Sequence, residues 1–283
     1  MRYSANKMEF LNAIFEYDFL ANALVACILS AVTCGIIGTY IVARRMVFLC
    51  GGITHASFGG LGIALYFGVN PILGAMIFAI LSALGIEWSA SHSKIRQDSA
   101  IGVIWGVGMA IGALFISLRP GYTSGDMSSF LFGNILTIPS NDVIALAVLA
   151  STLLMAGAIW HRQIMYVAFD REFARSQGVR VEAISYIMAI VTAITIVLSI
   201  RVMGIILLIS LLTIPVVGAN MVSKSYMKII PIAIAIAVFA GVAGVIFSYY
   251  TDVPSGPAII FVLGMSVLII KLLSLCVIRA KRP

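Results

Sequence analysis

The sequence has few charged residues. Lys, Arg, Asp and Glu make up 10% of its 283 residues, whereas hydrophobic residues make up 61%. A soluble domain has about 25% charged residues and roughly 45–50% apolar ones, and no polar stretch of this chain is long enough to form a domain. We therefore expect an integral membrane protein, with residues 1–283 forming one all-α transmembrane domain.

Several motifs are also missing. The N-terminal segment lacks the features of a signal peptide, so the first span is expected to stay in the mature protein. The sequence contains no P-loop, no Gly-x-Ser-x-Gly elbow and no His-Glu-x-x-His motif. We therefore expect no enzyme activity and no cofactor on this chain. Its net charge of +7 is attributed to membrane loops and not to a nucleic-acid partner.

Long apolar runs dominate the rest of the chain. A helix needs about 20 apolar residues to cross a bilayer, and the runs predict about nine such spans. They are 19–43, 46–67, 71–90, 99–118, 140–160, 183–200, 203–222, 229–249 and 256–276. Residues 125–138 could form a re-entrant segment, so eight spans plus this segment is the alternative.

The basic residues are distributed unevenly between the loops. One alternating set of loops, together with the C-terminal end, holds 14 of the 18 Lys and Arg residues. The positive-inside rule places that set in the cytoplasm. The N-terminus is then outside and the C-terminus cytoplasmic, which requires an odd number of spans. The expected location is a bacterial-type inner membrane.

Residues 161–182 interrupt the apolar pattern. They hold seven of the chain's 29 charged residues, and lipid cannot satisfy such a segment, so it must lie in water. The segment is too long for a turn and too short for a domain. We expect a short helix near Asp170–Gln177 on the cytoplasmic side, recognised by another subunit of a larger assembly.

Two predicted spans contain polar residues that could line a pore. His55 is either a hydrogen-bonded packing residue or a pore residue that contacts a transition metal. Glu87 and Asp98 are expected to anchor an interface or loop, although Glu87 and Thr54 could also support a pore site. Close helix packing, a kink or an unwound site would each account for the glycines around His55: Gly51, Gly52, Gly59, Gly60 and Gly62.

Two further glycine pairs lie in the span at 99–118. Gly102 and Gly106 form one small-xxx-small pair, and Gly108 and Gly112 form another. Such pairs allow helices to approach closely. Packing within the chain is the simpler interpretation, and a seam between two copies is the alternative.

A series of ordered motifs resembles the membrane subunit of the ABC-3 family, the zinc/manganese/iron ATP-binding-cassette importers. The resemblance extends from about residue 17 to 270. The motifs are Gly38–Val42 followed by Arg44–Met46, Thr54–Ala56, Asp98–Gly102, Leu131–Leu136, Ala168–Ala174 with Gly178, Gly204–Leu208, Thr213–Pro215 and Asp252–Pro257.

This resemblance implies a homodimeric pore with two cytoplasmic ATPase subunits, which bind ATP and Mg, and an external metal-binding protein. It also implies that His55 contacts the metal transiently in the pore. The segment Phe169–Gly178 would be a coupling helix that docks on the ATPase. Its implied coupling residues are Phe169, Asp170, Arg171, Glu172, Phe173, Ala174, Arg175 and Gly178.

The chain departs from the family pattern at one position. Many members carry Gly-Asp-x-x-Ser-His, which places a carboxylate and an imidazole on one helix face, but here Gly51 occupies the Asp position. We expect an importer pore for zinc or manganese, with iron less favoured. A pore for a metal chelate such as a siderophore, haem or cobalamin is the main alternative. An intramembrane enzyme or sensor is the second.

Overall fold

The computed structural model describes residues 16–92, 96–119 and 138–280, with the side chains of residues 18 and 275–280 left out. Every regular element within these ranges is a helix, which confirms the predicted all-α class. The proposed re-entrant segment at 125–138 lies outside these ranges except for its last residue. The helices are α2 (Asp18–Ala43), α3 (Val47–Phe67), α4 (Pro71–His92), α5 (Gln97–Ser117), α7 (Ser140–Phe169), α8 (Arg171–Ser176), α9 (Val181–Val222), α10 (Tyr226–Thr251) and α11 (Ser255–Ala280).

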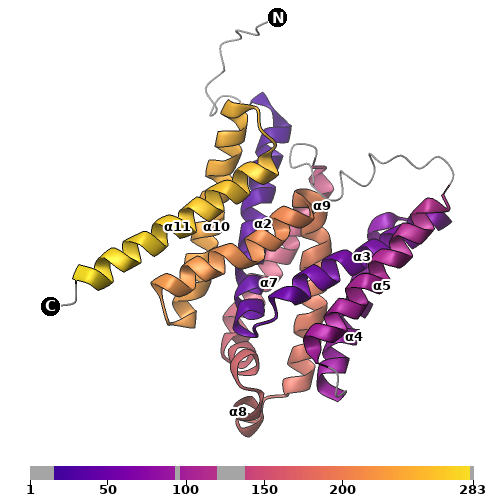
Figure 1. Ribbon diagram of the computed structural model, residues 1–283, viewed down its shortest axis with the longest axis horizontal. Coiled ribbons are helices and arrows are strands. Elements are labelled where there is room, and N and C mark those ends of the chain that lie inside the picture. The colour runs from indigo at the N-terminus through magenta and orange to yellow at the C-terminus, as the bar shows by residue number, and fades with distance from the viewer. Residues whose placement is uncertain (1–15, 93–95, 120–137, 281–283) are drawn as a thin grey trace, which may run out of the picture.

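Eight of these helices are long and apolar enough to cross a membrane. One of the eight, α9, has 42 residues and is interrupted at Gly204, whose backbone is non-helical with φ 75° and ψ 170°. A straight helix of that length would extend about 60 Å, twice the roughly 30 Å of a hydrocarbon core. Figure 1 shows α9 turning back at this break. The eight helices thus contain nine membrane-length segments, in agreement with the predicted number of spans.

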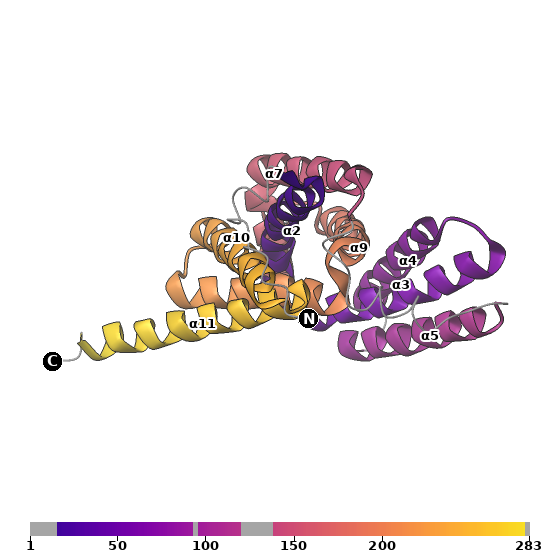
Figure 2. The same ribbon diagram turned by 90° about the horizontal axis from the view of Figure 1, so that it is seen from above.

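The helices form a central group with a smaller group beside it. Viewed from above, α2, α7, α9 and α10 lie together, α3, α4 and α5 lie to one side, and α11 extends to the other (Figure 2). The core is centred on α2 and α9, where Ile37, Ile196 and Leu208 are completely buried. Both segments of α9 contribute to this core, so the break at Gly204 lies within the packed body of the protein.

Glycines bring α3 into close contact with α4 and α5. A Cβ atom on Gly60 would lie 2.1 Å from the carbonyl oxygen of Gly74, and one on Gly108 would lie 2.6 Å from Cα of Ala56. Helix α3 is continuous from Val47 to Phe67. Of the three explanations for its glycines, the structure therefore supports close packing, with neither a kink nor an unwound segment.

The two glycine pairs of α5 have different surroundings. Gly108 and Gly112 pack directly against α3, as expected for contacts within the chain. A Cβ atom on Gly102 or Gly106, by contrast, would have no described heavy atom of another element within 4 Å. Gly102 and Gly106 are exposed, together with Val103. This part of α5 is therefore available for contact with another surface.

Candidate functional site

A buried cluster of charges joins several helices at the end of the molecule near α8. Glu87 of α4 is 2% exposed and accepts a hydrogen bond at 3.0 Å from Arg44, which directly follows α2. Arg171, the first residue of α8, forms an ion pair with the other carboxylate oxygen of Glu87. The cluster therefore connects the ends of α2 and α4 to the short helix α8.

Two uncharged side chains complete this cluster. Arg44 donates a second hydrogen bond to the Tyr40 hydroxyl at 3.0 Å, and Arg171 donates one to the Ser185 hydroxyl of α9 at 3.1 Å. Burial alone would lower the pKa of Arg44, but its contacts with Tyr40 and Glu87 outweigh this effect and raise that pKa. Charge-assisted hydrogen bonds of this kind are stronger than neutral ones. We call the five residues Tyr40, Arg44, Glu87, Arg171 and Ser185 the anchor cluster.

The short helix predicted near Asp170–Gln177 is present as α8. Its start is fixed by the Asp170 carboxylate, which accepts hydrogen bonds from the backbone N–H groups of Glu172 and Phe173, both at 3.0 Å. This is an N-cap, which satisfies N–H groups that have no partner within the helix. After the helix, Gly178 has a φ of +74°, a conformation that glycine adopts at little cost.

The predicted coupling residues lie on two different sides of α8. Ala174 is completely buried against Val167 and Val181, and Arg171 is held by the anchor cluster. These two residues therefore attach the helix to the rest of the protein. The other predicted residues face outward to a large extent.

The outward side of α8, together with the last residue of α7, combines aromatic and charged groups. Phe169 and Phe173 are 50% and 46% exposed, while Arg175 forms a solvent-exposed ion pair with Glu182 at 3.2 Å. Figure 1 shows α8 at one tip of the molecule, beyond the ends of the long helices. Exposed phenylalanines at a polar tip are typical of a protein-binding surface.

His55 lies in α3 and stacks on Trp105 of α5. The ring centroids are 4.4 Å apart and the planes differ by 7°. Within the described part of the chain, the buried Nδ1 atom of His55 has no hydrogen-bond partner. Because stacking and not hydrogen bonding holds the ring, the predicted hydrogen-bonded packing role is not what the described contacts show.

Trp105 also accounts for the glycine at position 51. A Cβ atom on Gly51 would lie 3.3 Å from the Trp105 ring, so an aspartate there would require the indole to move. A carboxylate at position 51, one turn before His55, would therefore lie next to the Trp105 ring. Thr54 is completely buried, in contrast to the partly buried His55–Trp105 pair.

Metal ligands are sparse in the structure. Among the described residues there is no group of three or more His, Cys, Asp or Glu side chains able to hold a metal ion. Glu87, a possible pore residue by sequence, has both carboxylate oxygens paired with arginines. Its position matches the anchoring role that the sequence analysis favoured.

Two contacts of the candidate site could not be predicted from the sequence. Glu87 is separated from Arg44 by 43 residues and from Arg171 by 84, and no local pattern links them. Trp105 lies between two glycines in an otherwise ordinary apolar span. The only available signals were the position of Arg44 at the end of a span and the isolation of Glu87 within one.

Comparison with known proteins agrees with this architecture. A probable metal transport system membrane protein of Chlamydia pneumoniae is 34% identical over 275 residues, covering 95% of this chain and 92% of that protein. The manganese transport system membrane protein MntC of Listeria monocytogenes is 29% identical, covering 90% of each chain. In the solved structure of PsaBC from Streptococcus pneumoniae in complex with Fab, one chain matches with a TM-score of 0.82 and 26% identity, over 93% of this chain and 94% of that one.

A family model assigns the chain as a whole. The model of the ABC 3 transport family matches residues 16–274, which include the anchor cluster, α8 and His55. The match, the membrane-length helices and the exposed tip at α8 agree on one class of protein. The chain therefore belongs to the ABC 3 transport family, and it is a multi-pass membrane permease subunit that leaves ATP hydrolysis to a separate subunit.

Proposed function

We propose that this chain forms the pore of an importer for a divalent transition metal, either zinc or manganese, with iron less favoured. The metal transport protein of Chlamydia pneumoniae and the manganese transport protein of Listeria monocytogenes support the substrate class. The structural observation that carries the proposal is α8, a short helix attached by buried charges, which together with the end of α7 exposes Phe169 and Phe173. A permease driven by a separate ATPase needs such a contact to receive the motion of its partner.

In this proposal α8 is the docking element for the ATPase, which binds ATP and Mg. Phe169 at the end of α7 and the outward residues Glu172, Phe173 and Arg175 of α8 contact the partner. Arg171 and Ala174 transmit the force. Replacing Glu172 by Arg reverses a charge on the exposed side and should weaken docking. Replacing Ala174 by Trp acts differently, because the added bulk would disrupt the buried side of α8.

The proposed orientation places α8 in the cytoplasm, the N-terminus outside and the C-terminus inside. A single cysteine at Arg175, in a variant otherwise free of cysteine, tests this directly because the Arg175 side chain is 59% exposed. An impermeant thiol reagent should label it in inside-out vesicles but not in intact cells. Labelling in intact cells would reverse the topology.

We also propose a homodimer, with the open Gly102 and Gly106 stripe of α5 at or near its seam. His55 and Trp105 lie on the same pair of helices, α3 and α5, and are only partly buried. A second copy packed nearby would enclose this pair in the translocation path. An extracytoplasmic metal-binding protein would then deliver the ion to the opposite end from α8.

His55 is proposed to contact the metal in passing. A single imidazole without a neighbouring carboxylate should bind a divalent ion weakly, and weak binding favours release. Metal selectivity would then depend largely on the external binding protein.

The test is uptake by proteoliposomes that contain the permease, its ATPase and the binding protein. Zinc, manganese and iron should be offered separately and in competition, with an ATPase variant unable to hydrolyse ATP as the control. ATP-dependent accumulation of zinc or manganese is the expected result. Uptake of a metal chelate without any uptake of free ions would refute the proposed substrate class.

A further inference from the structure

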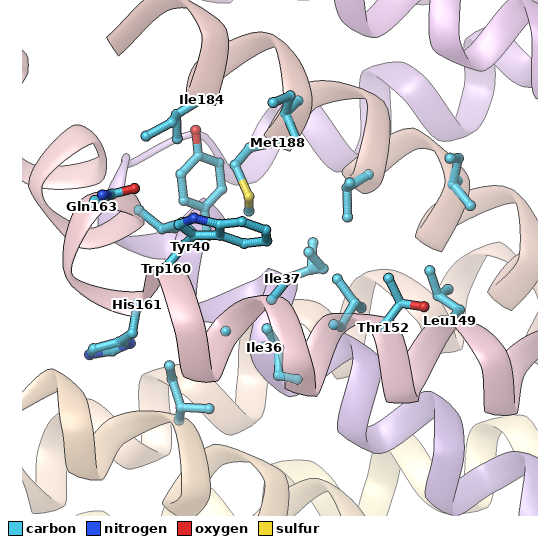
Figure 3. Close-up of a pocket in the computed structure, with 18 of the residues that line it drawn as sticks. Ile36, Ile37, Tyr40, Leu149, Thr152, Trp160, His161, Gln163, Ile184 and Met188 are labelled. Atoms are coloured by element: carbon cyan, nitrogen blue, oxygen red, sulfur yellow. The ribbon is translucent and has the colours of Figure 1, made fainter. Parts of the chain in front are cut away.

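A groove lies between α2, α7 and the first segment of α9, and none of its lining residues belongs to α3, α5 or α8. Its volume is about 600 Å³, and Figure 3 shows the side chains that form it. Three lining residues, Val148, Trp160 and Ile187, are 62%, 50% and 57% exposed. The groove is therefore open to the outer surface of the single chain.

The two ends of the groove differ in polarity. His161 and Gln163 lie at the same end as Trp160 and Tyr40, whereas Leu149 lies near the other end (Figure 3). Tryptophan and tyrosine concentrate at the membrane–water interface, and α7 continues beyond Trp160 towards the water-exposed α8. The polar end is thus at the level of the lipid headgroups.

The length of the groove fits one leaflet of a bilayer. Trp160 and Leu149 are eleven residues apart on α7, which corresponds to about 16 Å along a helix. Half of a hydrocarbon core is about 15 Å. The apolar part of the groove therefore extends from the headgroup region to about the middle of the membrane.

We propose that this groove binds one acyl chain of a membrane phospholipid, with the lipid phosphate beside His161, Arg162 and Gln163. The apolar walls suit a hydrocarbon chain, and a polar ligand would find few partners along them. The N–H groups of Arg162 and Gln163 can donate to a phosphate, and basic sites between membrane helices favour anionic lipid headgroups. The lipid would be retained by the protein and would not exchange like bulk lipid.

A glycine in the wall keeps the groove open. Gly157 lines it, and no described heavy atom lies within 4 Å of a Cβ atom built there. Glycine is unfavourable inside a helix, so this residue weakens α7 locally while leaving space for a ligand. A larger side chain at Gly157 would fit without a clash and would occupy the space assigned to the acyl chain.

The groove also adjoins the anchor cluster. Tyr40 forms part of its wall, and the hydroxyl of the same residue accepts the hydrogen bond from Arg44. A bound acyl chain would pack against the Tyr40 ring and restrict its movement. The lipid proposal concerns a different site from the metal path, so either proposal can fail without the other.

The test uses the full-length permease in complex with its ATPase, purified in mild detergent and examined by native mass spectrometry. Wild type should retain one phospholipid per permease chain. Gly157→Leu should reduce that retention at least tenfold. The matched control is Ala158→Leu, which places the same side chain on the next residue of α7, exposed and outside the groove lining. This control should retain the lipid as wild type does.

A second variant examines the headgroup end without filling the groove. Arg162 is exposed, so Arg162→Glu should fold normally and should reduce retention of added phosphatidylglycerol more than that of phosphatidylcholine. Equal retention by wild type, Gly157→Leu and Ala158→Leu would overturn the proposal. So would a wild type that retains no lipid, one that retains only a free fatty acid or detergent, or an Arg162→Glu variant that keeps phosphatidylglycerol fully.

Discussion

Removing the charge of Glu87 should destabilise the protein more than any other single charge removal near α8. The carboxylate is the only acidic group in the anchor cluster, where it faces two arginines. In the variant Glu87→Gln the shape of the side chain is kept but the negative charge is lost. The Arg44 side chain, 8% exposed, would then remain buried without a counter-charge.

The size of the effect follows from burial. Removing one partner of a buried ion pair costs about 3–5 kcal/mol, because the remaining charge is uncompensated. Arg171 is 30% exposed and can recover some hydration, so the main cost comes from Arg44. At about 2 °C per kcal/mol for a chain of this size, the melting temperature should fall by roughly 6–10 °C.

The matched control is Glu182→Gln, which also removes a carboxylate paired with an arginine of α8. The side chains of Arg175 and Glu182 are 59% and 69% exposed, and exposed pairs contribute at most about 1 kcal/mol. The control should therefore lower the melting temperature by about 2 °C or less.

A thiol-reactive fluorophore can follow unfolding in detergent, because Cys27, Cys34 and Cys50 are buried and react only when exposed. Cys276 would be replaced by Ser in every variant to remove its signal. Equal shifts for Glu87→Gln and Glu182→Gln would refute the proposed role of the cluster. Partial recovery in the double variant Glu87→Leu with Arg44→Met would support it, since an apolar pair can replace a buried ion pair.

Three other predictions concern packing, capping and the pore. Gly108→Leu should prevent folding of the protomer, because Cβ would lie 2.6 Å from Cα of Ala56. Gly102→Leu should fold but give less cross-linked dimer. Equal yields of the two folded variants in size-exclusion chromatography would contradict the different packing of the two glycines. Asp170→Ala should weaken the start of α8 by about 1 kcal/mol and accelerate amide hydrogen exchange there, and Asp170→Asn should restore protection. His55→Ala should slow metal uptake without changing folding or ATPase binding, and normal uptake of zinc, manganese and iron would indicate a packing role.

The sequence was sufficient to predict the all-α class and the approximate positions of the membrane-length segments. Membrane-length apolar runs have few alternatives, because only helices satisfy every backbone hydrogen bond within a single segment in lipid. The short helix α8 was also predictable, since seven charged residues in 161–182 cannot enter a membrane. The spans predicted at 183–200 and 203–222 belong in the structure to one interrupted helix, whose break lies at Gly204 and not at residues 201–202.

Contacts between distant segments were not predictable from a single sequence. Glu87 could be assigned to an anchor but not to its partners, because Arg44 and Arg171 lie on other helices at separations that no periodicity encodes. Trp105 illustrates the same limit. Its contact with His55 and Gly51 depends on the rotation of α5 relative to α3, which is set by the close approach of Gly108 to Ala56.

If α8 is the docking element proposed above, its two sides account for the rigidity that a six-residue helix would need to transmit movement. A helix this short is not stable alone, so its rigidity must come from its attachments: the Asp170 cap, the buried Ala174 and the ion pair of Arg171. The last of these reaches Glu87 on α4 and, through it, Arg44 at the end of α2. A displacement imposed on Phe173 from outside therefore moves the ends of two membrane helices together, because separating them would leave buried charges without partners.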